Sequence, residues 1–109
     1  MPTESATPLD TPLACVADAI SANERSAHFE LIRTLLALGS MRRRAMHDGY
    51  EFEFPADSFA DLCRFVENER KCCPFLSFTL GLTPNGGPVT LQLSGPKGTR
   101  EFLDAEFPR

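Results

Sequence analysis

The 109-residue sequence has no tryptophan, a single tyrosine and no long apolar run, and these shortages limit what the protein can be. No apolar run approaches the roughly 20 residues that a membrane-spanning helix needs, so we expect no membrane partner. The start of the chain, MPTESATPLDTPLAC, lacks the basic and apolar regions of a signal peptide, which predicts a cytoplasmic protein. In a reducing cytoplasm, the four cysteines are expected to be free, metal-bound or redox-active rather than joined in structural disulfides.

Positive charge is also scarce, because 11 Lys and Arg residues face 15 Asp and Glu residues and the formal net charge is −4. Proteins that bind the phosphate backbone need clustered cations, so we expect no nucleic-acid partner. The basic run Arg42-Arg43-Arg44 is short, and we interpret it as the wet side of a strand that lies across from Glu51 and Glu53.

Several familiar catalytic motifs are missing as well. The sequence contains no C-x-x-C, which removes the usual support for a zinc ribbon or a thioredoxin motif. Its G-P-K-G segment is too short for a P-loop, and no carboxylate pair stands in a hydrolase motif. The apolar fraction of 42% and the nine phenylalanines are nevertheless typical of one globular domain.

We divide the chain into a lead-in over residues 1–14 and a single domain over residues 15–109. The lead-in holds three prolines and three threonines and is expected to be extended or disordered. A capping box, Ser21 to Glu24, predicts a first helix that ends at Gly39. Its apolar stripe is expected to face the core, with His28 and Leu31 beside it; the stripe consists of Phe29, Ile32, Leu35 and Leu36.

Alternating residues predict two hairpins. Tyr50, Phe52 and Phe54 alternate with glutamates after an Asp48-Gly49 turn, with residues 41–46 as the partner strand. A strand that begins near residue 75 and a strand over residues 89–94 form the second hairpin. The inward side chains are expected to share one core, formed by Tyr50, Phe52, Phe54, Leu91, Leu93, Phe29 and Ile32.

A second helix separates the hairpins and a third ends the chain. The second is capped by Asp57 or Ser58 and ends over residues 71–73, because Pro74 cannot continue it. The third has Thr99 as its cap, with Phe102, Leu103 and Phe107 facing inward. The predicted order is α-ββ-α-ββ-α: a two-layer α+β domain with a four-stranded, mainly antiparallel sheet covered by helices.

The cysteines of the second helix invite different interpretations. Cys63 shares an apolar stripe with Phe59, Leu62 and Val66 and is predicted to be buried and inert. Cys73 is predicted to face the core, and Cys72, about 100° away around the helix, to point toward its margin or solvent. A disulfide between adjacent cysteines is strained, but two neighbouring thiolates can chelate a soft ion.

Two thiols need further ligands to make a strong site. Cys15 precedes the first helix and His28 lies in its first turns, so we predict a site of Cys15, Cys72, Cys73 and His28 for zinc, copper(I), mercury or arsenic(III). His47 and Glu69 are further candidates.

The charged residues next to the thiols have a supporting role in this prediction. Arg70 and Lys71 oppose the partial negative charge of the helix end, which disfavours thiolates. In the alternative interpretation, in which the thiols are structural, Glu69 and Arg70 form an ion pair or bond to the backbone at the turn.

Two other functions remain open. In the first, the protein is a thiol redox protein in which Cys72 attacks and Cys15 resolves. In the second, it is an interaction domain without chemistry, such as a homodimer, whose cysteines are structural.

Three segments also resemble a group of small bacterial proteins of unknown function. These are a cysteine before the first helix, the D-G-Y-x-F turn and strand, and the block E-R-K-C-C-P-F-L-S-F-T-L with the following G-P-V-T-L-Q-L-S-G-P-K-G-T-R-E-F-L. The resemblance covers most of the chain from Cys15 onward. It transfers no mechanism, but it implies that Cys15, Glu69, Arg70, Cys72 and Cys73 are the positions typical of the group.

Overall fold

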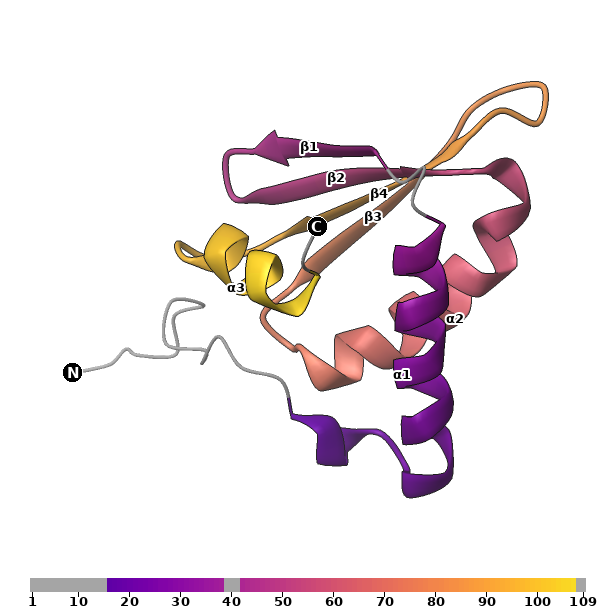
Figure 1. Cartoon of the computed structure of the whole chain (residues 1–109). Coiled ribbons are helices and arrows are strands. Elements are labelled where there is room, and N and C mark those ends of the chain that lie inside the picture. Colours follow the sequence, from indigo (N-terminus) through magenta and orange to yellow (C-terminus); the bar gives the residue numbers. More distant parts are fainter. Residues whose placement is uncertain (1–15, 39–41, 108–109) are drawn as a thin grey trace.

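The computed structural model describes residues 16–38 and 42–107 and has the predicted order of helices and strands (Figure 1). The elements in chain order are η2 (Ala17–Ala19), α1 (Ala22–Ala37), β1 (Arg42–Met46), β2 (Gly49–Phe54), η3 (Ala56–Ser58), α2 (Phe59–Cys72), β3 (Ser77–Leu82), β4 (Val89–Ser94) and α3 (Thr99–Glu106). The protein is therefore a single α+β domain, as predicted. The predicted lead-in over residues 1–14 lies outside the described residues.

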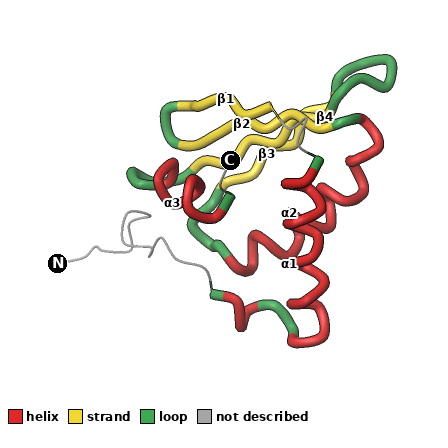
Figure 2. Tube along the Cα trace, viewed as in Figure 1, coloured by secondary structure: helices red, strands yellow, loops and turns green. Residues whose placement is uncertain are grey.

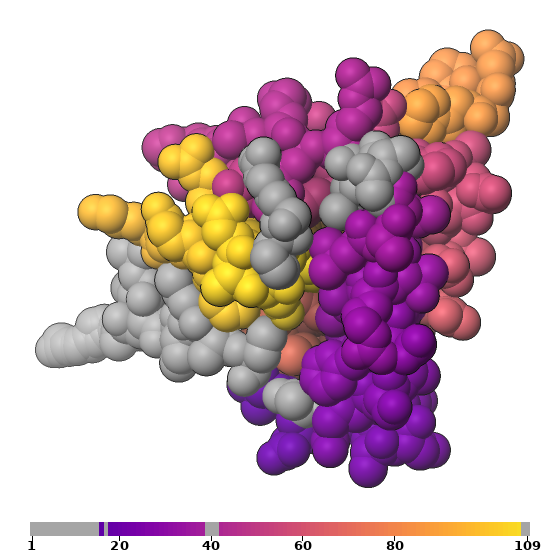
Figure 3. All heavy atoms as spheres, viewed as in Figure 1, coloured from indigo at the N-terminus to yellow at the C-terminus, as the bar shows by residue number. Residues whose placement is uncertain are grey.

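The four strands form one antiparallel sheet in the order β1-β2-β4-β3 (Figure 2). The central pair, β2 and β4, aligns Tyr50 with Leu93 and Phe52 with Leu91, and all four side chains are buried. The helices lie on one side of the sheet (Figure 1). The connection between β3 and β4, over residues 83–88, protrudes from the molecular surface (Figure 3).

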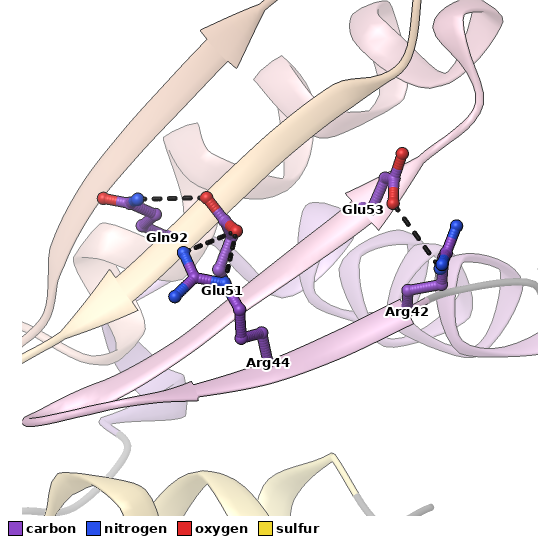
Figure 4. Close-up of polar contacts among 5 residues, drawn as sticks. All are labelled: Arg42, Arg44, Glu51, Glu53 and Gln92. Carbon is purple, nitrogen blue, oxygen red and sulfur yellow. Dashed lines mark hydrogen bonds and ion pairs between the residues drawn. The ribbon is translucent and has the colours of Figure 1, made fainter.

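The outer face of the sheet carries the predicted ion pairs (Figure 4). Arg42 lies opposite Glu53 and Arg44 opposite Glu51, with nitrogen–oxygen distances of 3.7 and 2.8 Å. Gln92, on β4, donates a hydrogen bond of 3.1 Å to the other oxygen of Glu51. The hydrogen bond from Gln92, followed by that from Arg44, holds the pKa of Glu51 below its usual value.

Arg43 departs from the predicted wet arrangement, because alternation along β1 turns it to the inner face. Its guanidinium carbon lies 5.1 Å from the ring centroids of both Tyr50 and Phe52. The side chain is largely buried and donates a hydrogen bond to the backbone oxygen of Phe107. Arg43 therefore joins the sheet to the end of α3 through cation–π contacts and a backbone hydrogen bond.

α1 begins at the predicted position, but its cap and its buried face differ from the prediction. The hydroxyl of Ser21 donates to the side-chain oxygen of Asn23 at 2.9 Å instead of completing a capping box. The buried side chains of α1 are His28, Leu31 and Leu35. Phe29, which was expected in the core, is 40% exposed, so the inward face is rotated by about one residue.

The predicted end of α1 and the predicted caps of α2 and α3 have different outcomes. The predicted stop at Gly39 lies outside the described residues. Ser58 is the N-cap of α2, as predicted, although its side chain makes no capping hydrogen bond. Gly98, whose φ of 99° suits glycine, takes the cap position of α3 that was predicted for Thr99. The hydroxyl of Thr99, the first residue of that helix, donates to the Pro96 carbonyl at 2.6 Å.

Candidate functional site

The end of α2 forms the predicted corner. The helix ends at Cys72, and Cys73 follows in a non-helical conformation with φ of −122° and ψ of 78°. The N–H of Cys73 still donates to the Glu69 carbonyl at 2.7 Å, and the Cys73 carbonyl accepts from the N–H of Leu76 at 3.1 Å. Pro74 has no N–H with which to extend the helix, so the chain turns here toward β3.

Both thiols of the corner are buried. Cys73 is 0% exposed, as predicted, but Cys72 is only 2% exposed, so the prediction that it would face a margin or solvent was wrong. Cys72 lies on the inner face of α2 together with Phe65 and Glu69. The segment before α1 also packs at this end of the helix. The short helix η2 contacts α2, and Val16 donates its N–H to the Cys72 carbonyl at 2.6 Å. This backbone hydrogen bond joins segments that are far apart in the sequence, so the local hydrophobic pattern could not predict it.

A buried carboxylate stands beside the thiols. Glu69 is 0% exposed, and one of its oxygens accepts a hydrogen bond of 2.9 Å from Nε2 of His28. The other oxygen accepts from Sγ of Cys73 at 3.4 Å. His28 is itself buried and stacks on Phe65 with ring centroids 5.8 Å apart. The site is therefore a polar chain, His28–Glu69–Cys73, enclosed by the core.

The ion pair between Glu69 and Arg70, one option of the structural alternative, is not formed. Glu69 points inward to His28 and Cys73, whereas Arg70 is exposed. The pairing fails because residues adjacent in a helix point about 100° apart, so they cannot share the inner face.

Three of these residues meet closely enough to share one ion. The ligand atoms of Glu69, Cys72 and Cys73 all lie within 4.8 Å of one another, and all three residues are buried. Two soft sulfur donors and one carboxylate oxygen make a chemically coherent ligand set for a thiophilic ion. His28 lies one hydrogen bond away, on Glu69, in the position of a residue that orients a ligand.

Cys15 lies outside the described residues, so its predicted part in the site stays a prediction. Its neighbour in the chain, Val16, is the residue that bonds to the Cys72 carbonyl. His47 lies in the turn between β1 and β2, where it is 95% exposed and its Nε2 is 3.5 Å from a carboxylate oxygen of Asp48. It is not among the residues that meet at the corner.

The prediction for Cys63 was wrong, because its side chain is exposed. The buried residues of α2 are Leu62, Phe65, Glu69 and Cys72, a spacing of three, four and three that marks one face of a helix. The expected stripe left out Glu69, because a charged side chain is normally assigned to solvent. Including Glu69 in the pattern would have moved Cys63 off the inner face.

The sequence interpretation also missed Glu106, near the end of α3. One of its carboxylate oxygens lies 3.9 Å from Sγ of Cys73, which is within the range of a long contact to sulfur. Cys73 therefore has a carboxylate from α2 on one side and a carboxylate from α3 on the other. No local sequence signal marks Glu106, because only tertiary packing brings α3 to the corner.

A surface hollow of about 310 Å³ lies between α1 and α2 and reaches His28. Charged and polar side chains surround its mouth; they include Glu24, Arg64, Glu67, Asn68 and Lys71. Nδ1 of His28 is buried and has no hydrogen-bond partner among the described residues. The hollow therefore brings solvent close to the side of the site that His28 occupies.

Comparisons of the chain with family models, curated proteins and solved structures gave no match. The resemblance to small bacterial proteins with an E-R-x-C-C-P-F block thus stays a prediction. In the part of the chain that the structure describes, no helix combines the length and the apolarity needed to cross a membrane.

Proposed function

We propose that the corner binds one soft metal or metalloid ion through Cys72, Cys73 and Glu69. The observation that carries this proposal is the convergence of two thiols and a carboxylate within 4.8 Å, all of them buried. Sulfur ligands bind a zinc-like ion at about 2.3 Å, so ligands on one ion lie roughly 4 Å apart or less. Small side-chain rotations are then enough to bring the three ligand atoms onto one ion.

The charges of the site support a cation. Cys73 donates its thiol hydrogen to Glu69, and an incoming ion takes the place of the thiol protons. The positive ion then offsets the two thiolates and the carboxylate, which would otherwise be buried negative charges. Thiolate ligands favour zinc, copper(I), mercury or arsenic(III) over hard ions such as magnesium.

We assign His28 and Cys15 supporting roles in this proposal. His28 donates to the Glu69 oxygen that faces away from Cys73 and holds the carboxylate in place. Cys15 is proposed as a third thiolate, because the adjacent residue, Val16, hydrogen-bonds to the backbone of Cys72.

The same backbone contact favours thiol redox chemistry between Cys15 and Cys72 as the second candidate function. Burial argues against it, because cysteines that react with outside partners are usually partly exposed, whereas Cys72 and Cys73 are 2% and 0% exposed. A purely structural role would explain two buried thiols. It also accommodates Glu69, because hydrogen bonds from His28 and Cys73 compensate the burial of the carboxylate, so metal binding has to be measured directly.

Native mass spectrometry of protein purified without chelator, with thiol counting, tests the proposal. We expect one bound ion per chain. After this ion has been stripped, titration with cadmium should again give one bound ion per chain. Cys72→Ser and Cys73→Ser should each weaken cadmium binding by more than about 100-fold, and Glu69→Gln or His28→Gln by about 10–100-fold. Cys63→Ser is the matched control, because this cysteine lies on the same helix but is exposed.

The outcomes separate the candidate functions. If the stripped wild type binds no cadmium, zinc, copper(I) or arsenic(III), the metal proposal fails. A Cys15–Cys72 crosslink formed under a mild oxidant, in protein that binds no metal, would support redox chemistry instead. A further variant, Cys15→Ser, shows whether the third thiol belongs to the site, since a bystander would leave the affinity unchanged.

A further inference from the structure

The two edges of the sheet differ in charge. β1 has the sequence RRRAM, whereas β3 has the sequence SFTLGL, with no charged residue and no proline. In the described part of the chain, β3 pairs with β4 alone, which leaves its outer edge without a neighbouring strand (Figure 1). Proteins usually protect such edges with charges or prolines, so the unprotected edge of β3 is suited to pairing with another strand.

Burial of the inner face decreases toward this edge. Phe78, Leu80 and Leu82 of β3 lie opposite residues of β4 that are 1–2% exposed. Phe78 and Leu80 are only partly buried, and Leu82 is 64% exposed. The helices of one chain therefore leave the apolar face of β3 incompletely covered.

α2 has a second apolar stripe beside its buried face. Phe59, Cys63 and Val66 follow helical spacing outside the buried face of α2, and Phe59 is 40% exposed. Val66 and Arg70 line a surface hollow together with Phe78, whereas Arg64, Glu67, Asn68 and Lys71 of α2 line the hollow shared with α1. We call these side chains the β3 patch; they are Phe59, Cys63, Val66, Phe78, Leu80 and Leu82.

We propose that the β3 patch binds a second copy of this chain. The two copies pair β3 with β3 in antiparallel orientation about a two-fold axis, and the two four-stranded sheets become one continuous sheet. An antiparallel edge strand is its own complement under a two-fold axis, so no other partner sequence is required. The α2 stripes of the two copies then approach each other above the joined strands and cover the apolar side chains.

Charge favours this pairing over the alternatives. A contact between two β1 edges would bring like-charged arginines together, whereas the β3 strands carry no charge. The two-fold axis also makes the α2 helices antiparallel. Arg70, which borders the patch near the end of α2, is thereby kept apart from Arg70 of the other copy.

The size of the surface predicts a weak dimer. Six residues of β3 and a few side chains of α2 contribute from each copy, whereas a standard stable interface uses roughly 20–30 residues a side. We therefore expect a dimer that dissociates on dilution.

Sedimentation velocity over a dilution series spanning roughly three decades, in a phosphine reductant, tests the proposal. We expect the mass of two chains at high concentration and of one chain at low concentration. Phe59→Lys and Leu82→Lys each place a cation in the patch and should raise the dissociation constant at least about tenfold. Phe29→Lys is the matched control, because Phe29 is also 40% exposed but lies on α1. Circular dichroism confirms that the variants fold.

Alkylation of Cys63 gives an independent measurement. Its exposed thiol should react more slowly at concentrations at which the dimer is populated than at concentrations at which the chain is monomeric. A chain that is monomeric throughout the series overturns the proposal. So does a dimer that Phe29→Lys disrupts while Phe59→Lys and Leu82→Lys leave it intact.

Discussion

On the outer face of the sheet, Glu51 accepts hydrogen bonds from Arg44 and Gln92, and its side chain is partly exposed to solvent. On the inner side of α2, Glu69 accepts from His28 and Cys73 and is completely buried. Both carboxylates have two partners, but water solvates only Glu51 when a partner is lost. The environment of a carboxylate, more than its number of partners, therefore decides how strongly the stability of the fold depends on it.

The largest expected difference is in the free energy of unfolding of two variants, each of which lacks one of these carboxylates, measured in metal-free protein. Glu69→Ala should lower the free energy of unfolding by about 3–5 kcal/mol, because it leaves Nε2 of His28 buried without its acceptor and removes the nearer acceptor of Cys73. Glu51→Ala should lower it by less than about 1 kcal/mol, because its partners remain solvated. Urea denaturation of both variants measures the contrast, and equal losses would show that burial does not distinguish the two sites.

A double variant sharpens this prediction. His28→Phe alone should destabilise the protein, because it leaves the Glu69 carboxylate buried without its histidine. Combining it with Glu69→Leu replaces both polar groups by apolar ones and should lose at least about 1 kcal/mol less than the sum of the two single variants. Additive losses would mean that the two residues act independently.

The cysteines of α2 extend the comparison with a smaller expected effect. Cys72→Ser should lower the free energy of unfolding by about 1–3 kcal/mol, because a hydroxyl replaces a buried thiol. Cys63→Ser should change it by less than about 0.5 kcal/mol, because that side chain is exposed. Thermal denaturation under reductant checks both values. A larger loss for Cys63→Ser than for Cys72→Ser would contradict the assigned burial.

The smallest expected effect is a change in how the free energy of unfolding depends on pH. The pKa of Glu51 is lowered in the folded state, so this state binds a proton less readily than the unfolded chain, whose glutamates titrate near about 4.3. The resulting stabilisation is present above that value and is lost as pH falls through the lower, folded pKa.

Glu51→Gln should therefore flatten the dependence of unfolding free energy on pH in this acidic window. Denaturant titrations at a series of pH values measure the slope. An unchanged slope in the variant would assign the acid sensitivity to other carboxylates. Added salt should weaken the contribution of Arg44, since exposed charges are screened.

Local pattern was enough to predict the order of the elements, the two hairpins and the corner at the end of α2. The alternation of Tyr50, Phe52 and Phe54 shows the inner face of a strand, because a strand has only two faces. Pro74 shows the helix end, because proline lacks the N–H that the helix needs. These features depend on residues close together in the chain, and the structure agrees with them.

Tertiary structure alone decided how each helix is rotated about its axis, and that rotation made the site. A helix has many possible inward faces, and hydrophobicity favoured the faces with Phe29 and Cys63. In the structure, both helices are rotated differently, so that His28 and Glu69 point inward. The hydrogen bond between these two residues joins α1 to α2 across 41 residues. Because a buried carboxylate is tolerated only beside suitable partners, its position depends on contacts between helices that no local pattern encodes.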